Sequence, residues 1–247
     1  MAVIERFFEK GKLVTRHSVD PVSCFVMGVD LGQSNDPTAI AVIHHRREVR
    51  DGWTTVMYPG GGGRVTQNYE ERFEVRFLQR LPLLTPYPEQ VSHVAGLMAR
   101  PPLVGSELAI DDTGVGRAVG DMFDAAGLKP IRITQTAGLT EDHVDERRWH
   151  VPKGVLFSVL DARLHRGELR FAPKLTEAEA TKEEFMDYQR RISAAGRASY
   201  EARQGKHDDI VSAVQIALWT ALRPRSTSSW FPHPPAYDPV SFSKFRG

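Results

Sequence analysis

The stretch from Cys24 to Val42 constrains the fold of this chain more than any other. Its sequence, CFVMGVDLGQSNDPTAIAV, predicts a buried strand, a tight turn and a second strand, because apolar runs flank a cluster of turn-forming residues. Asp30 lies inside the first apolar run, where an uncompensated carboxylate would be costly. The folded chain must therefore supply partners that offset this charge.

The composition sets outer limits on the protein class. With 247 residues the chain can bury one substantial core, as in a single α/β or α+β domain with extensions. A net charge of +1 excludes a bulk polycation, so any contact with DNA must use a local basic surface. No apolar run approaches the ~18 residues of a membrane helix, and no signal peptide is evident, so we expect a soluble, cytoplasmic protein.

The first part of the chain predicts antiparallel strands. Residues 23–31 and 37–45 flank the turn and should pair as a hairpin, and a third strand is expected at 52–58. Apolar positions in 67–100 are compatible with one or two helices interrupted by prolines. We expect residues 1–22 to form a peripheral lead-in that precedes the main domain.

The middle of the chain predicts parallel pairing. A short buried strand at 107–110 ends in Asp111, a helix is expected over 116–126, and another strand over 130–134. This order implies a right-handed parallel crossover. The predicted fold class is therefore α/β, with a mixed sheet.

The remainder predicts further helices, a short strand and a tail. Helices are expected at 153–166, 177–192 and 209–222, with a short strand at 169–171 and a loop or short hairpin at 193–205. The predicted organisation is a lead-in at 1–22, a main domain at 23–222 and a tail rich in proline and aromatic residues at 223–247.

Acidic residues from distant parts of the chain lie at elements whose other face should be buried. They are Asp30, Asp111 and one of Asp208 and Asp209. Alternation in the segment ELAID places Asp111 on the same side of its strand as Ala109. The three carboxylates can converge if the strands that carry Asp30 and Asp111 are neighbours and the last helix packs on them.

The helix periodicity distinguishes the two candidates on the last helix. Asp209 shares a face with Ala213 and Ala217, which are small enough to let a helix approach a sheet closely. Asp208 points about 100° away and suits an N-cap role.

Converging carboxylates require protons or cations between them. Hard oxygen ligands suit Mg²⁺ or Mn²⁺. Two such ions, roughly 3.5–4 Å apart, activate a water and stabilise the leaving oxygen of a phosphodiester. The residues therefore predict a two-ion site for phosphodiester hydrolysis.

Four segments together resemble the nuclease domain of large terminase subunits, the DNA-packaging proteins of tailed double-stranded DNA phages. They read GVDLGQSNDPTAIAVI, AIDDTGVGRAV, VPKGVLFSVLDARLHRGELRFAP and SYEARQGKHDDIVSAVQIALW, and the resemblance spans residues 24–222. It implies an RNase H-like mixed sheet with antiparallel first strands, parallel βαβ units and helices on both faces. It also implies a metal-dependent endonuclease that cuts concatemeric viral DNA in the cytoplasm of the infected host cell.

The resemblance also assigns site residues. The family's acids fall on Asp30, on Asp111 and on Asp208 or Asp209, and the helical-face argument favours Asp209. Nearby basic residues are candidate contacts to phosphate or water: Lys153, Lys206, His207 and Arg203.

The chain departs from the family pattern in one respect, the packaging ATPase. Large terminases usually carry an N-terminal packaging ATPase with a P-loop, and neither GGGGRV nor EKGKLV has the P-loop pattern. We expect an excised domain or, with a slight preference, one half of a split terminase. Its expected partners are double-stranded DNA, a packaging ATPase, a portal and a small terminase. The tail at 223–247 is a candidate docking segment for the motor, and no membrane is involved.

Three alternatives remain at this point. A Holliday-junction resolvase-like enzyme shares such a site but typically carries another acid where this chain has Ser212. An actin-like nucleotide-binding protein also opens with a GVDLG strand, but needs a second phosphate-binding hairpin and an adenosine motif. A packaging adaptor without activity would keep only the fold, whereas all three acids are present here.

Overall fold

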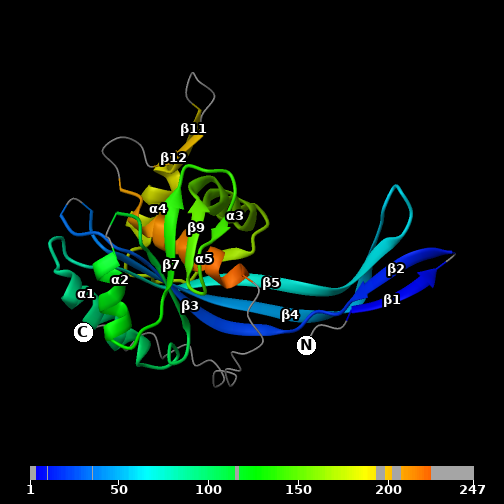
Figure 1. Ribbon diagram of the computed structural model, residues 1–247, viewed down its shortest axis with the longest axis horizontal. Helices are drawn as coiled ribbons and strands as arrows, with labels where there is room; N and C mark the ends of the chain where they lie inside the picture. Colours follow the sequence, from blue (N-terminus) through cyan, green and yellow to red (C-terminus); the bar gives the residue numbers. More distant parts are fainter. Residues whose placement is uncertain are drawn as a thin grey trace.

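The computed structural model describes residues 4–9, 11–34, 36–114, 117–192, 198–201 and 207–223. The strands are β1 (Ile4–Glu9), β2 (Lys12–His17), β3 (Val22–Asp30), β4 (Ala39–Met57), β5 (Gly63–Arg80), β6 (Glu107–Asp111), β7 (Ile131–Thr136), β8 (Asp142–His143), β9 (Arg148–Pro152), β10 (Leu169–Phe171), β11 (Gln189–Ile192) and β12 (Ala198–Glu201). The helices are α1 (Tyr87–Met98), α2 (Arg117–Ala125), α3 (Lys153–His165), α4 (Ala178–Asp187) and α5 (Asp209–Leu222). Together they form a body from which a long β-arm extends (Figure 1).

One mixed sheet runs through the body. Among the described residues its strand order is β1-β2-β5-β4-β3-β6-β7-β9-β8, and β10 pairs with β5. The β3–β4 and β4–β5 pairs are antiparallel, whereas β3–β6, β6–β7 and β7–β9 are parallel. The predicted mixed sheet, with antiparallel strands first and parallel crossovers after them, is confirmed.

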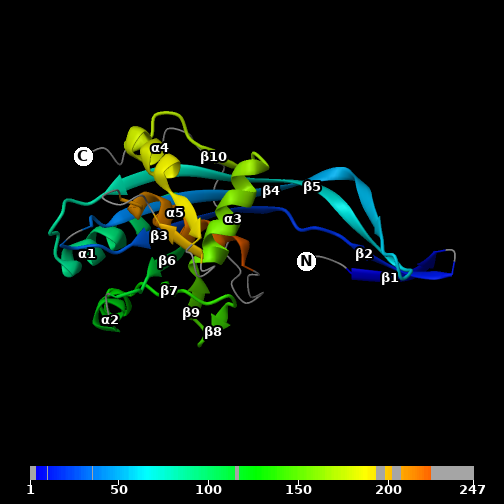
Figure 2. The ribbon, with the colours of Figure 1, turned by 90° about the horizontal axis from the view of Figure 1, so that it is seen from above.

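Helices cover both faces of this sheet. One face packs against α5, with α3 and α4 outside it, and the other against α1 and α2 (Figures 1 and 2). Alternation along β3 explains the two layers, since Val26 belongs to the core on the α5 side whereas Phe25 and Met27 belong to the core on the α1 side.

Gly28 sets the distance between β3 and α5. A Cβ atom at this position would lie 2.2 Å from the backbone oxygen of Ala213 and 2.7 Å from the backbone nitrogen of Ala217. A side chain there would push the helix away from the sheet. The α5 helix is buried along almost its whole length, and this close packing brings its N-terminus to the end of β3.

The β-arm differs from the sequence prediction. The strands expected at 37–45 and 52–58 form one continuous strand, β4, which pairs with β5 out to Met57. Residues 67–80, for which helix was predicted, belong to β5. The helical reading failed because β5 carries many charged residues, which its neighbour β4 matches with ion pairs such as Arg50–Glu70 and Arg47–Glu71.

The N-terminal residues join the arm. The β1–β2 hairpin pairs with β5 through β2, so the described part of 1–22 adds strands to the sheet (Figures 1 and 2). The Arg16 guanidinium lies 5.2 Å from the ring centres of both Phe7 and Trp53, which ties the hairpin to β4.

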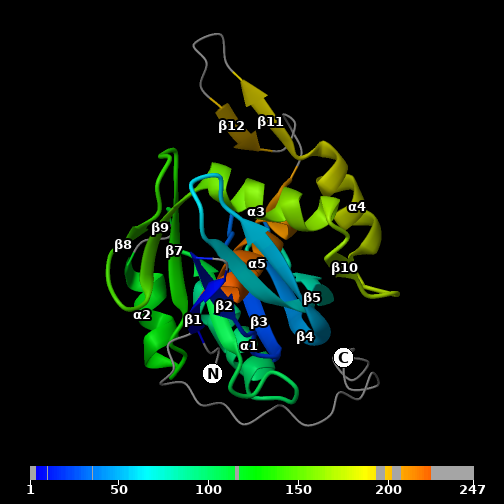
Figure 3. The ribbon, with the colours of Figure 1, turned by 90° about the vertical axis from the view of Figure 1, so that its right-hand side faces the viewer.

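The second half of the body largely follows the predictions. The helices expected at 153–166 and 209–222 are α3 and α5, whereas the helix expected at 177–192 is shorter and is followed by β11. The β11–β12 hairpin projects beside α3 and α4 (Figure 3). None of the described helices is both long and apolar enough to span a bilayer. Residues 224–247 of the predicted tail lie outside the described residues.

Candidate metal centre

The carboxyl ends of β3 and β6 place Asp30 and Asp111 side by side at one edge of the sheet. The two strands pair in parallel with Val29 opposite Ile110, and the next residue of each strand is an aspartate. Side chains of alternate residues in a strand face the same side of the sheet, so both aspartates lie on the side that packs against α5, as Gly28 does. The predicted meeting of these two strands is therefore observed.

Several negative charges act on Asp30. Burial raises the pKa of its carboxyl well above the ordinary value, and the charges of Asp111, Asp209 and Asp208 raise this pKa further. A hydrogen bond from Ser212 on α5 opposes the rise. The charges of Asp111, Asp209 and Asp208 therefore all act on Asp30.

Asp111 is held by a loop and a neighbouring strand. The Thr113 N–H donates to its Oδ1 at 2.8 Å, and Gln135 Nε2 donates to its Oδ2 at 2.5 Å. Burial raises the pKa of Asp111, whereas these hydrogen bonds and the positive charge of Lys153 lower it. Lys153, the first residue of α3, thus lies near the acids.

Asp209 is buried at the start of α5, with 5% of its surface exposed. No described residue donates a hydrogen bond to its Oδ2, although Arg80 Nε lies 3.7 Å and His207 Nδ1 3.9 Å from this oxygen. Burial raises the pKa of Asp209 to about 6, and the charges of Asp36 and Asp208 also act in this direction. An orphaned, buried carboxylate oxygen is a position that a cation would satisfy.

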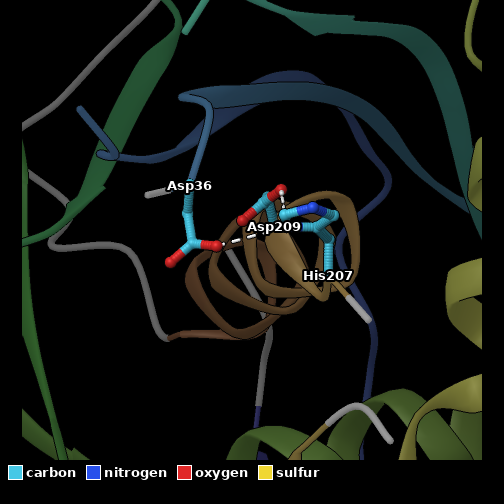
Figure 4. A group of neighbouring side chains, drawn as sticks. All are labelled: Asp36, His207 and Asp209. Carbon is cyan, nitrogen blue, oxygen red and sulfur yellow. Dashed lines mark hydrogen bonds and ion pairs between the residues drawn. The ribbon is translucent and has the colours of Figure 1, made fainter. Parts of the chain in front are cut away.

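Asp36, from the turn between β3 and β4, joins this group. One ligand atom each from Asp36, His207 and Asp209 lie within 4.8 Å of one another, and Asp36 Oδ1 is 3.1 Å from His207 Nδ1. Figure 4 shows the three side chains facing one another at the N-terminal end of α5. A signal was available, because Asp36 belongs to the loop that leaves the same sheet edge as Asp30.

Asp208 occupies the N-cap position of α5, but its side chain makes no capping hydrogen bond. Glu184 of α4 caps the helix instead, since its Oε2 accepts from the backbone N–H groups of Ile210 and Val211 at 2.9 and 3.1 Å. Arg80 forms an ion pair with the same carboxylate. The predicted N-cap role of the Asp208 side chain is therefore wrong, because a carboxylate from α4 already occupies this place.

The donor set suits a hard divalent cation. It offers carboxylate oxygens from Asp30, Asp111 and Asp209, flanked by the Asp36 carboxylate and the His207 imidazole. Oxygen-rich sets of this kind fit Mg²⁺ and Mn²⁺, and Mn²⁺ also accepts imidazole. A cation would offset the cost of burying these carboxylates in their charged form, which is the main cause of their raised pKa values. The predicted contacts Lys206 and Arg203 lie outside the described residues.

Comparisons with known proteins give structural relatives but no sequence family. No family model matches the chain, and no curated protein matches it in sequence. The large terminase nuclease from the thermophilic phage G20c with bound magnesium is similar, with a TM-score of 0.54, 17% identity, and coverage of 88% of this chain and 91% of that one. The Thermus phage P74-26 large terminase nuclease domain is also similar, with a TM-score of 0.51, 15% identity, and coverage of 79% and 78%. The chain therefore has the RNase H-like fold of large terminase nuclease domains.

Proposed function

We propose that this chain is a divalent-cation-dependent endodeoxyribonuclease that cuts concatemeric viral DNA during genome packaging. The observation that carries the proposal is that Asp30 and Asp111 end neighbouring parallel strands, where the charge of Asp209 at the start of α5 also acts on Asp30. A site with this much buried negative charge is suited to cations and to a phosphodiester, whose oxygens complete their coordination. The shared fold with large terminase nucleases supports the same reading.

The acids divide into two candidate cation positions. Asp30 and Asp111, with Asp208 or Asp209, would hold one Mg²⁺ or Mn²⁺, and the group of Asp36, His207 and Asp209 would hold a second. G20c terminase nuclease structures with bound magnesium and bound cobalt favour divalent ions here. Such ions supply an activated water and stabilisation of the leaving oxygen.

The residues around the acids would hold the substrate. Lys153 is placed to neutralise phosphate charge beside Asp111, and Lys206 and Arg203 are proposed for the same task. Recognition of double-stranded DNA through phosphates would be largely independent of sequence. Translocation would fall to a packaging ATPase on another chain or domain, with portal and small terminase as further partners in the host cytoplasm and residues 223–247 as the docking segment for the motor.

A plasmid-nicking assay with Mg²⁺ or Mn²⁺ tests the proposal. We expect cutting of supercoiled DNA that EDTA abolishes. Asp30→Asn and Asp111→Asn should each reduce the rate by at least ~100-fold, since each removes a proposed carboxylate ligand of the cation. Asp51→Asn, an exposed residue of the arm, is the matched control and should cut like wild type.

Three outcomes would overturn this reading. Full activity of folded Asp30→Asn and Asp111→Asn variants would exclude the proposed chemistry. Cutting of branched but not linear duplexes would favour a resolvase-like enzyme. Tight binding of ATP without any cutting would favour a nucleotide-binding protein.

A further inference from the structure

Two uncharged polar residues, Gln135 and Ser212, lie between Asp111 and Asp30. Gln135 lies on β7, the strand next to β6, and its Nε2 donates both to Asp111 Oδ2 at 2.5 Å and to Ser212 Oγ at 3.1 Å. The Ser212 hydroxyl on α5 in turn lies close enough to Asp30 to lower the pKa of its carboxyl. Two carboxylates from neighbouring strands are thus joined through a third strand and a helix.

The direction of each bond follows from the chemistry of the groups. A carboxylate can only accept, so the amide of Gln135 must present its NH₂ group to Asp111. The second amide proton then meets Ser212 Oγ, which leaves the hydroxyl proton free to donate to Asp30. Both protons of the amide are used. The bridge therefore has one consistent polarity, from amide to hydroxyl to carboxylate.

The backbone of Gln135 is fixed as well. Its N–H donates to Thr113 Oγ1 at 2.7 Å, and the Thr113 N–H donates to Asp111 Oδ1 at 2.8 Å. Both carboxylate oxygens of Asp111 therefore accept hydrogen bonds, one from Thr113 and one from Gln135, and these two residues are hydrogen-bonded to each other. Each of these oxygens keeps a further lone pair for another partner.

We propose that Gln135, acting through Ser212, is a positioning residue that sets the mutual geometry of Asp30 and Asp111 for a divalent cation. This inference rests on the proposed function. Neutral donors at these two positions restrain the rotamers of the acids without adding a further negative charge. Groups that orient metal ligands in this way commonly change metal affinity by about 10–100-fold when removed.

Titration calorimetry of the purified full chain with Mn²⁺ measures the affinity for the cation and so tests the inference without relying on activity. Gln135→Met keeps the length of the side chain but cannot donate, and should weaken Mn²⁺ binding by about 10–100-fold. Gln67→Met, a glutamine of the arm, is the matched control and should bind Mn²⁺ like wild type. Asp30→Asn reports on the site itself and should bind Mn²⁺ much more weakly than wild type.

A pair of substitutions at Ser212 separates hydrogen bonding from packing. Threonine keeps the hydroxyl and valine replaces it with a methyl group of nearly the same shape. Ser212→Thr should retain Mn²⁺ affinity and Ser212→Val should lose it, with both variants melting at similar temperatures in EDTA. Equal affinities of these two variants would overturn the positioning role, as would a Gln135→Met variant that binds Mn²⁺ like wild type.

The same titrations distinguish the two proposals. Absence of Mn²⁺ binding by wild type, or unchanged binding by Asp30→Asn, would overturn the proposed metal-dependent function and the positioning role with it. Binding that requires Asp30 but not Gln135 would overturn the positioning role alone.

Discussion

At the scale of single residues, the candidate centre is a group of acids that destabilise one another. Asp30, Asp111 and Asp209 are all shifted toward the protonated form, with burial as the largest cause in each case. Such groups lower the stability of the folded chain when they ionise, and a bound cation reverses this effect. The ionised acids are therefore unfavourable in the folded chain unless a positive charge offsets them, as the proposed cation would.

The loss of folding stability that accompanies ionisation can be measured at Asp209. Its pKa of about 6 lies above the ordinary 3.8, so its ionisation opposes folding fully above pH 6 and not at all below pH 3.8. In EDTA, Asp209→Asn should raise the free energy of unfolding by about 3 kcal/mol at pH 8, and by about half as much at pH 5. Urea unfolding at the two pH values measures the difference. If Asp209→Asn stabilised the chain more at pH 5 than at pH 8, the raised pKa of Asp209 would be contradicted.

At the scale of elements, the site depends on how α5 meets the sheet. The helix supplies Asp209 and Ser212, and the absence of a side chain at Gly28 lets its backbone approach β3. Glu184 of α4 fixes the N-terminus of the same helix by capping it. The position of the third acid is thus determined by packing and capping together.

A methyl group at Gly28 should therefore disturb both stability and site. We expect Gly28→Ala to lower the free energy of unfolding by about 1–3 kcal/mol, because the added Cβ would overlap the backbone of α5. Gly96→Ala in α1 is the matched control, since no atom lies within 4 Å of its Cβ position, and it should stabilise by about 0.5–1 kcal/mol. Urea denaturation measures both, and a neutral Gly28→Ala would show that α5 can shift freely.

At the scale of the whole molecule, the arm and the acids lie at opposite ends of the same strands. β4 begins opposite Asp30 at Ala39 and runs out to Met57 in the arm (Figure 1). Between the two ends, buried Glu71 contacts His45 of β4 at 2.9 Å and Arg163 of α3 at 3.5 Å, so the base of the arm is fixed to the body. The arm therefore continues the sheet away from the acids, and its base is held against α3.

Cation binding should stabilise the body as a unit, because the proposed ligands come from β3, β6 and α5. At a Mn²⁺ concentration about 100 times its dissociation constant, the stabilisation is about 2.7 kcal/mol, or roughly 5–10 °C in melting temperature. Differential scanning calorimetry with Mn²⁺ and then with excess EDTA measures the shift and its reversal. Asp30→Asn should show little shift, and an equal shift in this variant would place the binding elsewhere.

The sequence by itself determined which residues form the central elements and which acids share a face. Local alternation placed Asp111 on the same side of its strand as Ala109, and helical periodicity placed Asp209 on one face with Ala213 and Ala217, because these patterns depend only on backbone geometry. These expectations needed no knowledge of distant contacts.

Only the tertiary structure decided how distant segments complete the site. The β5 strand, the capping of α5 by Glu184, the approach of Asp36 to His207 and the bridge through Gln135 all depend on contacts between residues far apart in the chain. Charged or polar side chains such as these look like solvent-exposed or turn residues in a local window. Their partners become visible only once the sheet order and the packing of α5 are set, because hydrogen bonds and ion pairs act at contact distance and not along the sequence.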